Sequence, residues 1–152
     1  MPATYDRVGL RFLYPDNWKL MEADHDSQPE TVSLQSPGGG FWSLMVYRGR
    51  LDALELTRKL VEAMSVEYEA LESSACEERL GAYDAEGFDM WFHCLDFLVA
   101  ARTLAIRHDN DVLLLLWQAE DREFDTLLPV FRAMTTSLLN SLADTVSQAE
   151  VE

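Results

Sequence analysis

The stretch GLRFLYPDNWKL, residues 9–20, decides the fold, because it holds a strand, a forced stop and the start of a second strand. Side chains alternate up to Tyr14, which is typical of a strand over 8–14. Pro15 fixes φ and has no N–H to donate, so the strand ends there. The next strand opens near Trp18, and we expect its indole to cover the edge of the core.

Further strands follow from the same kind of pattern. They are predicted over 31–35, 41–48, 70–80, 88–98, 101–108 and 112–119. The SPGGG segment at 36–40 and the Asp109-Asn110-Asp111 turn give tight connections, so neighbouring strands should pair antiparallel. The last strand, VLLLLWQA, is apolar almost throughout, which indicates burial on both faces and a central place in the sheet.

Two segments carry helical periodicity. The first is predicted over about 52–68, with Asp52 as its cap and Glu55 completing a capping box. The second is predicted over about 121–141. Pro129 interrupts its pattern, so we expect a kink or a restart there, capped by Asp125 or Thr126.

The order of elements sets the fold class, which is α+β. We predict an α/β/α sandwich around a central, mainly antiparallel sheet of seven or eight strands, in the order ββββαββββα. Residues 1–142 form a single domain in this prediction, and the polar tail at 143–152 frays.

Composition and charge limit the possible functions. The chain has 152 residues, 48% of them hydrophobic, which suits a core that needs no metal or disulfide. Acidic residues number 27 against 12 Lys and Arg, and the net charge is −15. That charge argues against nucleic acid and anionic membranes and favours a basic protein partner, although solubility alone also explains it. No apolar run is long enough to insert across a bilayer.

Cysteine and histidine give no clear site. Cys76 and Cys94 lack a metal-like spacing, so we expect reduced thiols, no disulfide and a cytoplasmic location. His93 precedes Cys94 on a strand, so their side chains point to opposite faces and cannot pair directly. Cys94 is expected to be buried and slow toward thiol reagents. His25, between two aspartates, and His108, before a turn, lack the spacing of metal ligands.

Carboxylates and arginines give no stronger signal. Asp84, Glu86 and Asp89 gather near a turn, without an apolar pocket to raise the pKa of one of them. Arg102 and Arg107 are too scattered to bind nucleic acid. We therefore predict no catalytic, cofactor-binding or metal-binding residue and no cofactor.

The order of elements, together with three motifs, resembles the PsbP/Mog-like superfamily. The motifs are Tyr14-Pro15-x-x-Trp18, Phe41-Trp42-x-Leu44 and Phe131-x-x-Met134-x-x-Ser137-Leu138. The resemblance runs from Val8 to Leu138. It implies an α/β/α sandwich that binds other proteins and has no shared enzyme activity, and it assigns no site residue.

Two functions remain open. The first is a non-catalytic protein-interaction module, such as an adaptor, an assembly factor or a chaperone. The second is a small-ligand-binding protein or enzyme with a pocket between sheet and helix, near Trp91 or Trp117. A solid core with one exposed apolar patch favours the first, and a buried, water-filled pocket beside a perturbed carboxylate favours the second. We predict the first.

Overall fold

The computed structural model describes residues 1–7, 9–22 and 29–151, and the side chains of 144–151 lie outside that description. The elements in chain order are β1 Pro2–Arg7, β2 Leu10–Pro15, β3 Lys19–Glu22, β4 Glu30–Gln35, β5 Phe41–Tyr47, α1 Ala53–Glu67, β6 Glu72–Leu80, β7 Tyr83–Cys94, β8 Phe97–His108, β9 Asp111–Glu120 and α2 Asp121–Val151.

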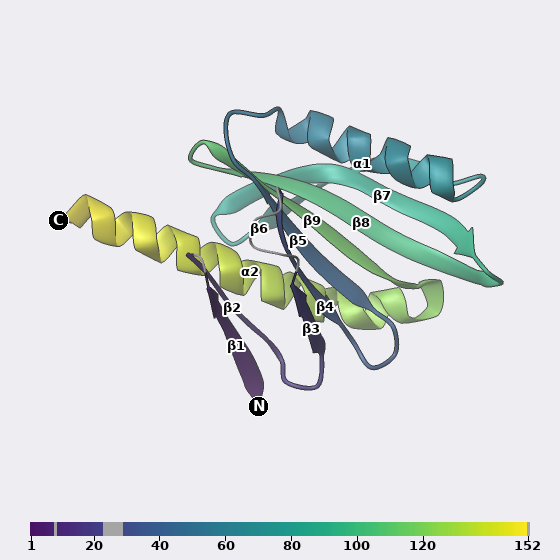
Figure 1. The fold of residues 1–152 in the computed structure, drawn as a ribbon, viewed down its shortest axis with the longest axis horizontal. Helices are drawn as coiled ribbons and strands as arrows, with labels where there is room; N and C mark the ends of the chain where they lie inside the picture. Colours follow the sequence, from purple (N-terminus) through teal and green to yellow (C-terminus); the bar gives the residue numbers. More distant parts are fainter. Residues whose placement is uncertain (8, 23–28, 152) are drawn as a thin grey trace.

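Seven of these strands form the central sheet, in the order β3-β4-β5-β9-β8-β7-β6 with every neighbouring pair antiparallel. The helices α1 and α2 lie on opposite faces of this sheet (Figure 1). The predicted α/β/α sandwich is therefore confirmed. β9 lies at the centre of the sheet, as its apolar run predicts, because Leu113 and Leu115 pack toward α2 while Val112 and Leu114 pack toward α1.

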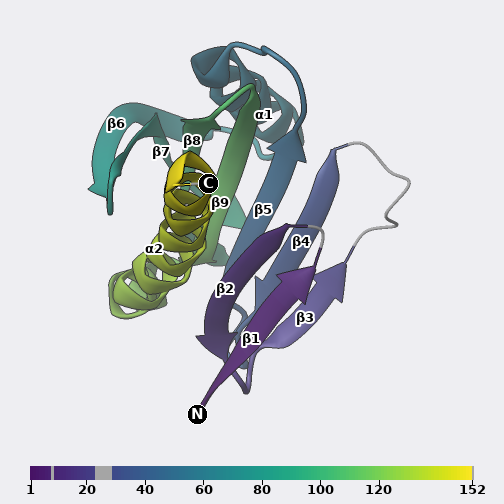
Figure 2. The ribbon, with the colours of Figure 1, turned by 90° about the vertical axis from the view of Figure 1, so that its left-hand side faces the viewer.

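The opening strand does not join the central sheet, and this corrects the sequence prediction. β2 pairs with β1 in a separate two-stranded sheet. The ring of Tyr5 stacks on the ring of Phe12, with the two centroids 5.1 Å apart. The ring centroid of Phe12 in turn lies 4.9 Å from that of Trp42. The β1–β2 hairpin therefore packs beside α2 on the same side of the central sheet (Figure 2). β1 was missed because Tyr5 is its single buried side chain, which leaves no alternation to read.

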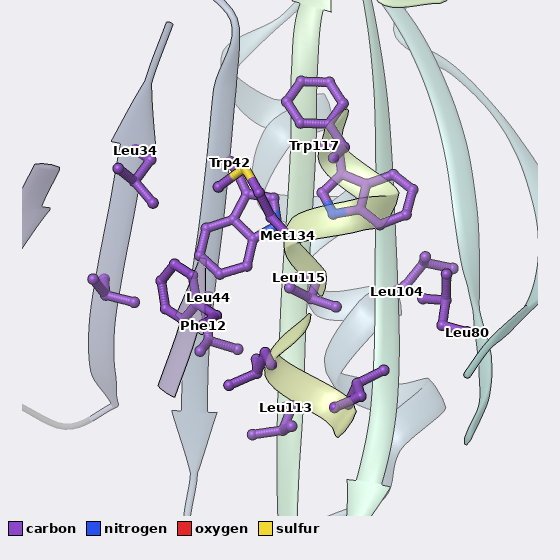
Figure 3. Packing of buried hydrophobic residues seen from close by; sticks show 14 of the residues in the cluster. Phe12, Leu34, Trp42, Leu44, Leu80, Leu104, Leu113, Leu115, Trp117 and Met134 are labelled. Carbon is purple, nitrogen blue, oxygen red and sulfur yellow. The ribbon is translucent and has the colours of Figure 1, made fainter. Parts of the chain in front are cut away.

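The forced stop after β2 behaves as predicted. The Trp18 N–H donates to the Pro15 carbonyl at 3.0 Å, which closes the turn. The Trp18 indole is buried and meets the ring of Phe131 edge-on at 6.0 Å, so it covers the core as expected. Figure 3 shows the centre of this core, where Met134 of α2 lies between Trp42 and Trp117.

The two helices follow the predicted positions with one correction. Asp52 caps α1, because its Oδ1 accepts from the Glu55 N–H at 3.2 Å. α2 is uninterrupted across Pro129 and begins at Asp121, so a restart capped by Asp125 or Thr126 is wrong. Pro129 is exposed, so water can satisfy the carbonyl that the proline leaves without a donor. α2 extends to Val151, while a single domain over 1–142 and fraying of the tail stay predictions.

Candidate functional site

The connection between β7 and β8 is a two-residue turn built from unusual residues. Cys94 pairs with Phe97, so Leu95 and Asp96 form the turn, and Leu95 has a φ of +57°. The β8–β9 turn has the same length and the same left-handed first residue, but that residue is Asp109, with a φ of +54°. Aspartate tolerates this conformation and leucine does not, so the β7–β8 turn holds an apolar side chain against its backbone preference.

Exposed apolar side chains gather near this turn on both faces of the β7–β8 hairpin, because the register places Trp91 and Leu98 on one face and Phe97 on the other. Four of the eight exposed large apolar residues in the described part of the chain lie here, and Leu95 is 90% exposed. We call them the hairpin tip, which consists of Trp91, Leu95, Phe97 and Leu98. Single exposed apolar residues are ordinary, whereas a cluster is typical of a surface that contacts another molecule.

Several acidic residues belong to the elements at the same end of the molecule as the hairpin tip. The end of α1, the tip and the start of α2 lie at the same end of the molecule (Figure 1). We call the carboxylates at this end the acidic rim; they belong to Glu67, Glu69, Glu72, Asp96, Glu120, Asp121 and Glu123. Arg122 lies among them, but its Nη2 is paired with Glu120 at 2.6 Å. The rim would attract a cationic surface and repel an anionic one.

Behind the tip, an ion network joins β6, β7, β8 and α2. Arg102 donates to Asp89 Oδ1 at 2.6 Å and to Glu78 Oε2 at 2.8 Å, and Arg132 of α2 donates to the other oxygen of Glu78. Burial acts to lower the pKa of Arg102, but the hydrogen bond to Asp89 and the negative charges of Asp89 and Glu78 together outweigh burial and raise that pKa, so the guanidinium stays charged. Every charged group here has a partner, so the network fixes β6 against α2.

Cys76 is half-buried beside this network, and its thiol is a poor nucleophile. Burial raises the pKa of Cys76 to about 11, and the Asp89 carboxylate adds to the rise while Arg102 opposes it. Since only the thiolate attacks, we predict that Cys76 in a Cys94→Ala variant reacts with a disulfide reagent at about pH 8 on the order of tenfold more slowly than a free thiol. The rate should rise with pH up to about 11, and a rate equal to that of a free thiol would contradict the raised pKa.

The cysteine and carboxylates singled out in the sequence do not converge. Cys94 is half-buried and not buried, because it adjoins the exposed turn, while its neighbour His93 is exposed. Asp84 pairs with Arg79 at 2.8 Å on the α1 side of the sheet, and Asp89 points to the α2 side. Asp84 and Glu86 line one hollow on the α1 side, but Asp89 lies on the opposite face, so the three carboxylates do not form one site.

The histidines are likewise apart. The Nδ1 of His108 lies 3.3 Å from the Tyr83 hydroxyl, and the Arg107 guanidinium donates to the Leu51 carbonyl. The segment 24–26, with His25, lies outside the described residues. Within the described ranges, no group of three His, Cys, Asp or Glu side chains could hold a metal ion. The absence of metal and cofactor stays a prediction.

A hollow of about 910 Å³ lies between β2 and α2. The Leu13 N–H of β2 donates to Ser137 Oγ of α2 at 3.0 Å, so the helix occupies part of the free edge of that strand. Neither Trp91 nor Trp117 lines this hollow, and Trp117 is fully buried. None of the helices in the described ranges is long and apolar enough to cross a bilayer.

Sequence reasoning missed the hairpin tip. The run FDMWFHCLDFL was assigned to one strand over 88–98, whereas β7 ends at Cys94 and β8 begins at Phe97. The Leu95-Asp96 turn lacks glycine, proline and asparagine, which are the usual signals of a reversal. The remaining signal is apolar residues on both sides of 95–96, where a half-buried strand should alternate.

Comparisons with known proteins bear on the fold. No protein-family profile and no curated protein matches the chain. The solution structure of the cyanobacterial PsbP protein, CyanoP, from Synechocystis sp. PCC 6803 is similar, with a TM-score of 0.62 and 12% identity over 90% of each chain. A Bacteroides thetaiotaomicron protein gives a TM-score of 0.55 and 12% identity over 78% of this chain and 41% of its own. At these identities the likeness concerns the fold alone, and the chain therefore has a PsbP-like fold, as its motifs suggest.

Proposed function

We propose that the protein is a non-catalytic protein-interaction module, such as an adaptor, an assembly factor or a chaperone, and that it binds its partner through the hairpin tip. The observation that carries this proposal is Leu95, an apolar side chain that is 90% exposed in a left-handed backbone conformation. Strain of this kind persists where function uses it. The sequence resemblance, which implies protein binding, supports the same function.

The surroundings of the tip define the chemistry of the partner. Trp91, Leu95, Phe97 and Leu98 would be buried against apolar side chains, which supplies most of the affinity at an interface. The acidic rim would face lysine and arginine at the edge of the contact, where charge mainly speeds association. The partner is therefore a protein with an apolar patch flanked by basic residues. A cytoplasmic location stays part of this proposal, supported by the free thiols of Cys76 and Cys94.

Leu95→Asn separates binding from folding. Asparagine tolerates the left-handed conformation, so the free energy of unfolding should rise by about 1 kcal/mol and Tm by about 2–4 °C. Binding should weaken by about tenfold, because the central apolar contact is lost. Thermal denaturation measures the first effect. Quantitative affinity capture from native cell extract, followed by dissociation constants for the retained protein, measures the second.

Val66→Asn is the matched control for this prediction. Val66 of α1 is also 90% exposed, and valine and asparagine have similar helix propensities, so binding and stability should stay near those of the wild type. If Leu95→Asn and Val66→Asn retain the same proteins in the same amounts, the hairpin tip is not the binding surface.

A further inference from the structure

The two edge strands of the central sheet, β3 and β6, differ in length and in how far they are protected from further strand pairing. β3, at one edge, has four residues, and Arg7 of β1 pairs across to its Glu22 at 2.8 Å. β6, at the other edge, has nine residues and pairs with β7 in unbroken register from Glu72 to Leu80. Within the described part of the chain, no strand pairs with the outer side of β6.

β6 also lacks most of the devices that protect a free edge. Proteins block such edges with proline, bulges, lysine or a short strand, and β6 has none of these. The side chains from Glu72 to Ala75 are exposed in succession, so neither α1 nor α2 covers that half of the strand. The protection that remains is charge, which is negative at Glu72, Glu77 and Glu78 and positive at Arg79, whose guanidinium is paired with Asp84 at 2.8 Å.

Charge decides which strand this edge can accept. A second copy of the chain carries a net charge of −15 and the same edge carboxylates, so it would be repelled. Glu78 is held by Arg102 and Arg132, but Glu72 and Glu77 form no ion pair with any described residue. An incoming strand with lysine or arginine opposite these two carboxylates would be attracted.

The position of Glu77 shows where one such cation would lie. Glu77 stands directly opposite Glu86 in the β6–β7 ladder, and like charges in that arrangement destabilise a sheet. Both side chains line a hollow of about 580 Å³ beside the start of α1. Arg107 and Arg79 line it too, but the Arg107 guanidinium donates to the Leu51 carbonyl and Arg79 is paired with Asp84 at 2.8 Å. The hollow therefore has space for a positively charged side chain from a partner, and the carboxylates of Glu77 and Glu86 would attract it.

We propose that the free edge of β6 accepts an added antiparallel strand from a basic partner, with lysine or arginine of that strand facing Glu77 and Glu72. Main-chain hydrogen bonds to the edge would supply affinity, and the two cations would set the register. Glu77 and Glu72 point to opposite faces of the sheet, so the partner carries its basic residues on alternate faces of an extended segment. This site shares Glu72 with the acidic rim, and Glu72 stands opposite Trp91 in the β6–β7 ladder. Glu77 belongs to neither the rim nor the hairpin tip, so a substitution there tests the edge of β6 separately.

The probe is a synthetic peptide of the same length as β6, made of alternating threonine and valine, with lysine where it faces Glu77 and Glu72. Titration into the isotope-labelled protein, followed by amide chemical shifts, should move resonances of Ser73 to Arg79 most. Glu77→Lys should weaken binding of this peptide by about fivefold, and should favour a second peptide that carries glutamate in place of lysine. Leu95→Asn should leave both peptides unaffected, which keeps this test separate from that of the hairpin tip.

Glu62→Lys on the exposed face of α1 is the matched control, because it makes the same change in net charge away from β6. If Glu77→Lys and Glu62→Lys weakened binding of the lysine peptide equally, the effect would come from the net charge of the protein and not from the edge of β6. That result would overturn the proposal. The proposal would also be overturned if the peptide changed amide chemical shifts only outside β6. It would equally be overturned if, without any peptide, the chemical shifts of β6 changed with the concentration of the protein. The latter would identify a second copy as the occupant.

Discussion

Phe131→Ala is expected to lower the free energy of unfolding by about 3–5 kcal/mol, a large part of the total stability of a domain this size. Phe131 is fully buried on α2, and its ring centroid lies 6.0 Å from those of Trp18, Trp117 and Phe124. These rings come from the turn before β3, from β9 and from α2, so the alanine leaves a cavity where three segments meet. Chemical denaturation should show a lower midpoint with an unchanged slope.

Val66→Ala is the control for this prediction, since Val66 is 90% exposed on α1 and packs against nothing in the core. Its effect on the free energy of unfolding should stay within about 0.5 kcal/mol. A loss of less than about 1 kcal/mol for Phe131→Ala would mean that the surrounding aromatic rings can collapse into the space, which contradicts close packing around Phe131.

Gly87→Ala should be nearly as damaging, for a different reason. A Cβ at Gly87 would lie 1.8 Å from the carbonyl oxygen of Thr103 on β8, and that oxygen belongs to backbone. Thr103 cannot easily yield, because it is fully buried and its hydroxyl donates to the Leu115 carbonyl of β9 at 2.8 Å. We expect a loss of about 3 kcal/mol in the free energy of unfolding, measured by chemical denaturation.

Gly38→Ala makes the same chemical change where the chain can accommodate it. The nearest atom to a Cβ at Gly38 is Glu123 Oε2, at 3.2 Å, which ends a flexible side chain. Stability should therefore change little, or rise slightly because alanine restricts the unfolded chain. If both glycine variants behave alike, the close approach of β7 to β8 at Gly87 is not a determinant of stability.

Local signals in the sequence predicted the parts of the fold in which side-chain chemistry and backbone geometry agree. Pro15 ended β2, Asp52 capped α1, and the apolar run of β9 placed that strand at the centre of the sheet. Burial on both faces leaves a continuous apolar pattern, and a proline removes a donor wherever it occurs. These signals need no knowledge of distant contacts.

The remaining features depend on contacts that no local pattern records. β1 has one buried side chain, Tyr5, whose partner Phe12 becomes a neighbour only after the hairpin forms. The turn at the hairpin tip was not predicted, because leucine is rare at the left-handed position that Leu95 occupies. The pattern over 88–98 therefore indicated one continuous strand. The same mismatch makes it a candidate site, since departures from local preference concentrate at functional positions.

The central position of β9 has a consequence for how the protein is made. β3, β4 and β5 form one antiparallel piece and β6, β7 and β8 another, and β9 alone joins them, through pairs such as Trp42 with Trp117. A ribosome releases β9 after α1 and all the other strands. Until β9 is available, the nascent chain holds two separate antiparallel pieces. The apolar edge strand of each, β5 in one and β8 in the other, lacks its pairing partner, which in both cases is β9. The last strand must therefore insert between them, a long-range closure that slows folding and prolongs the exposure of those edges.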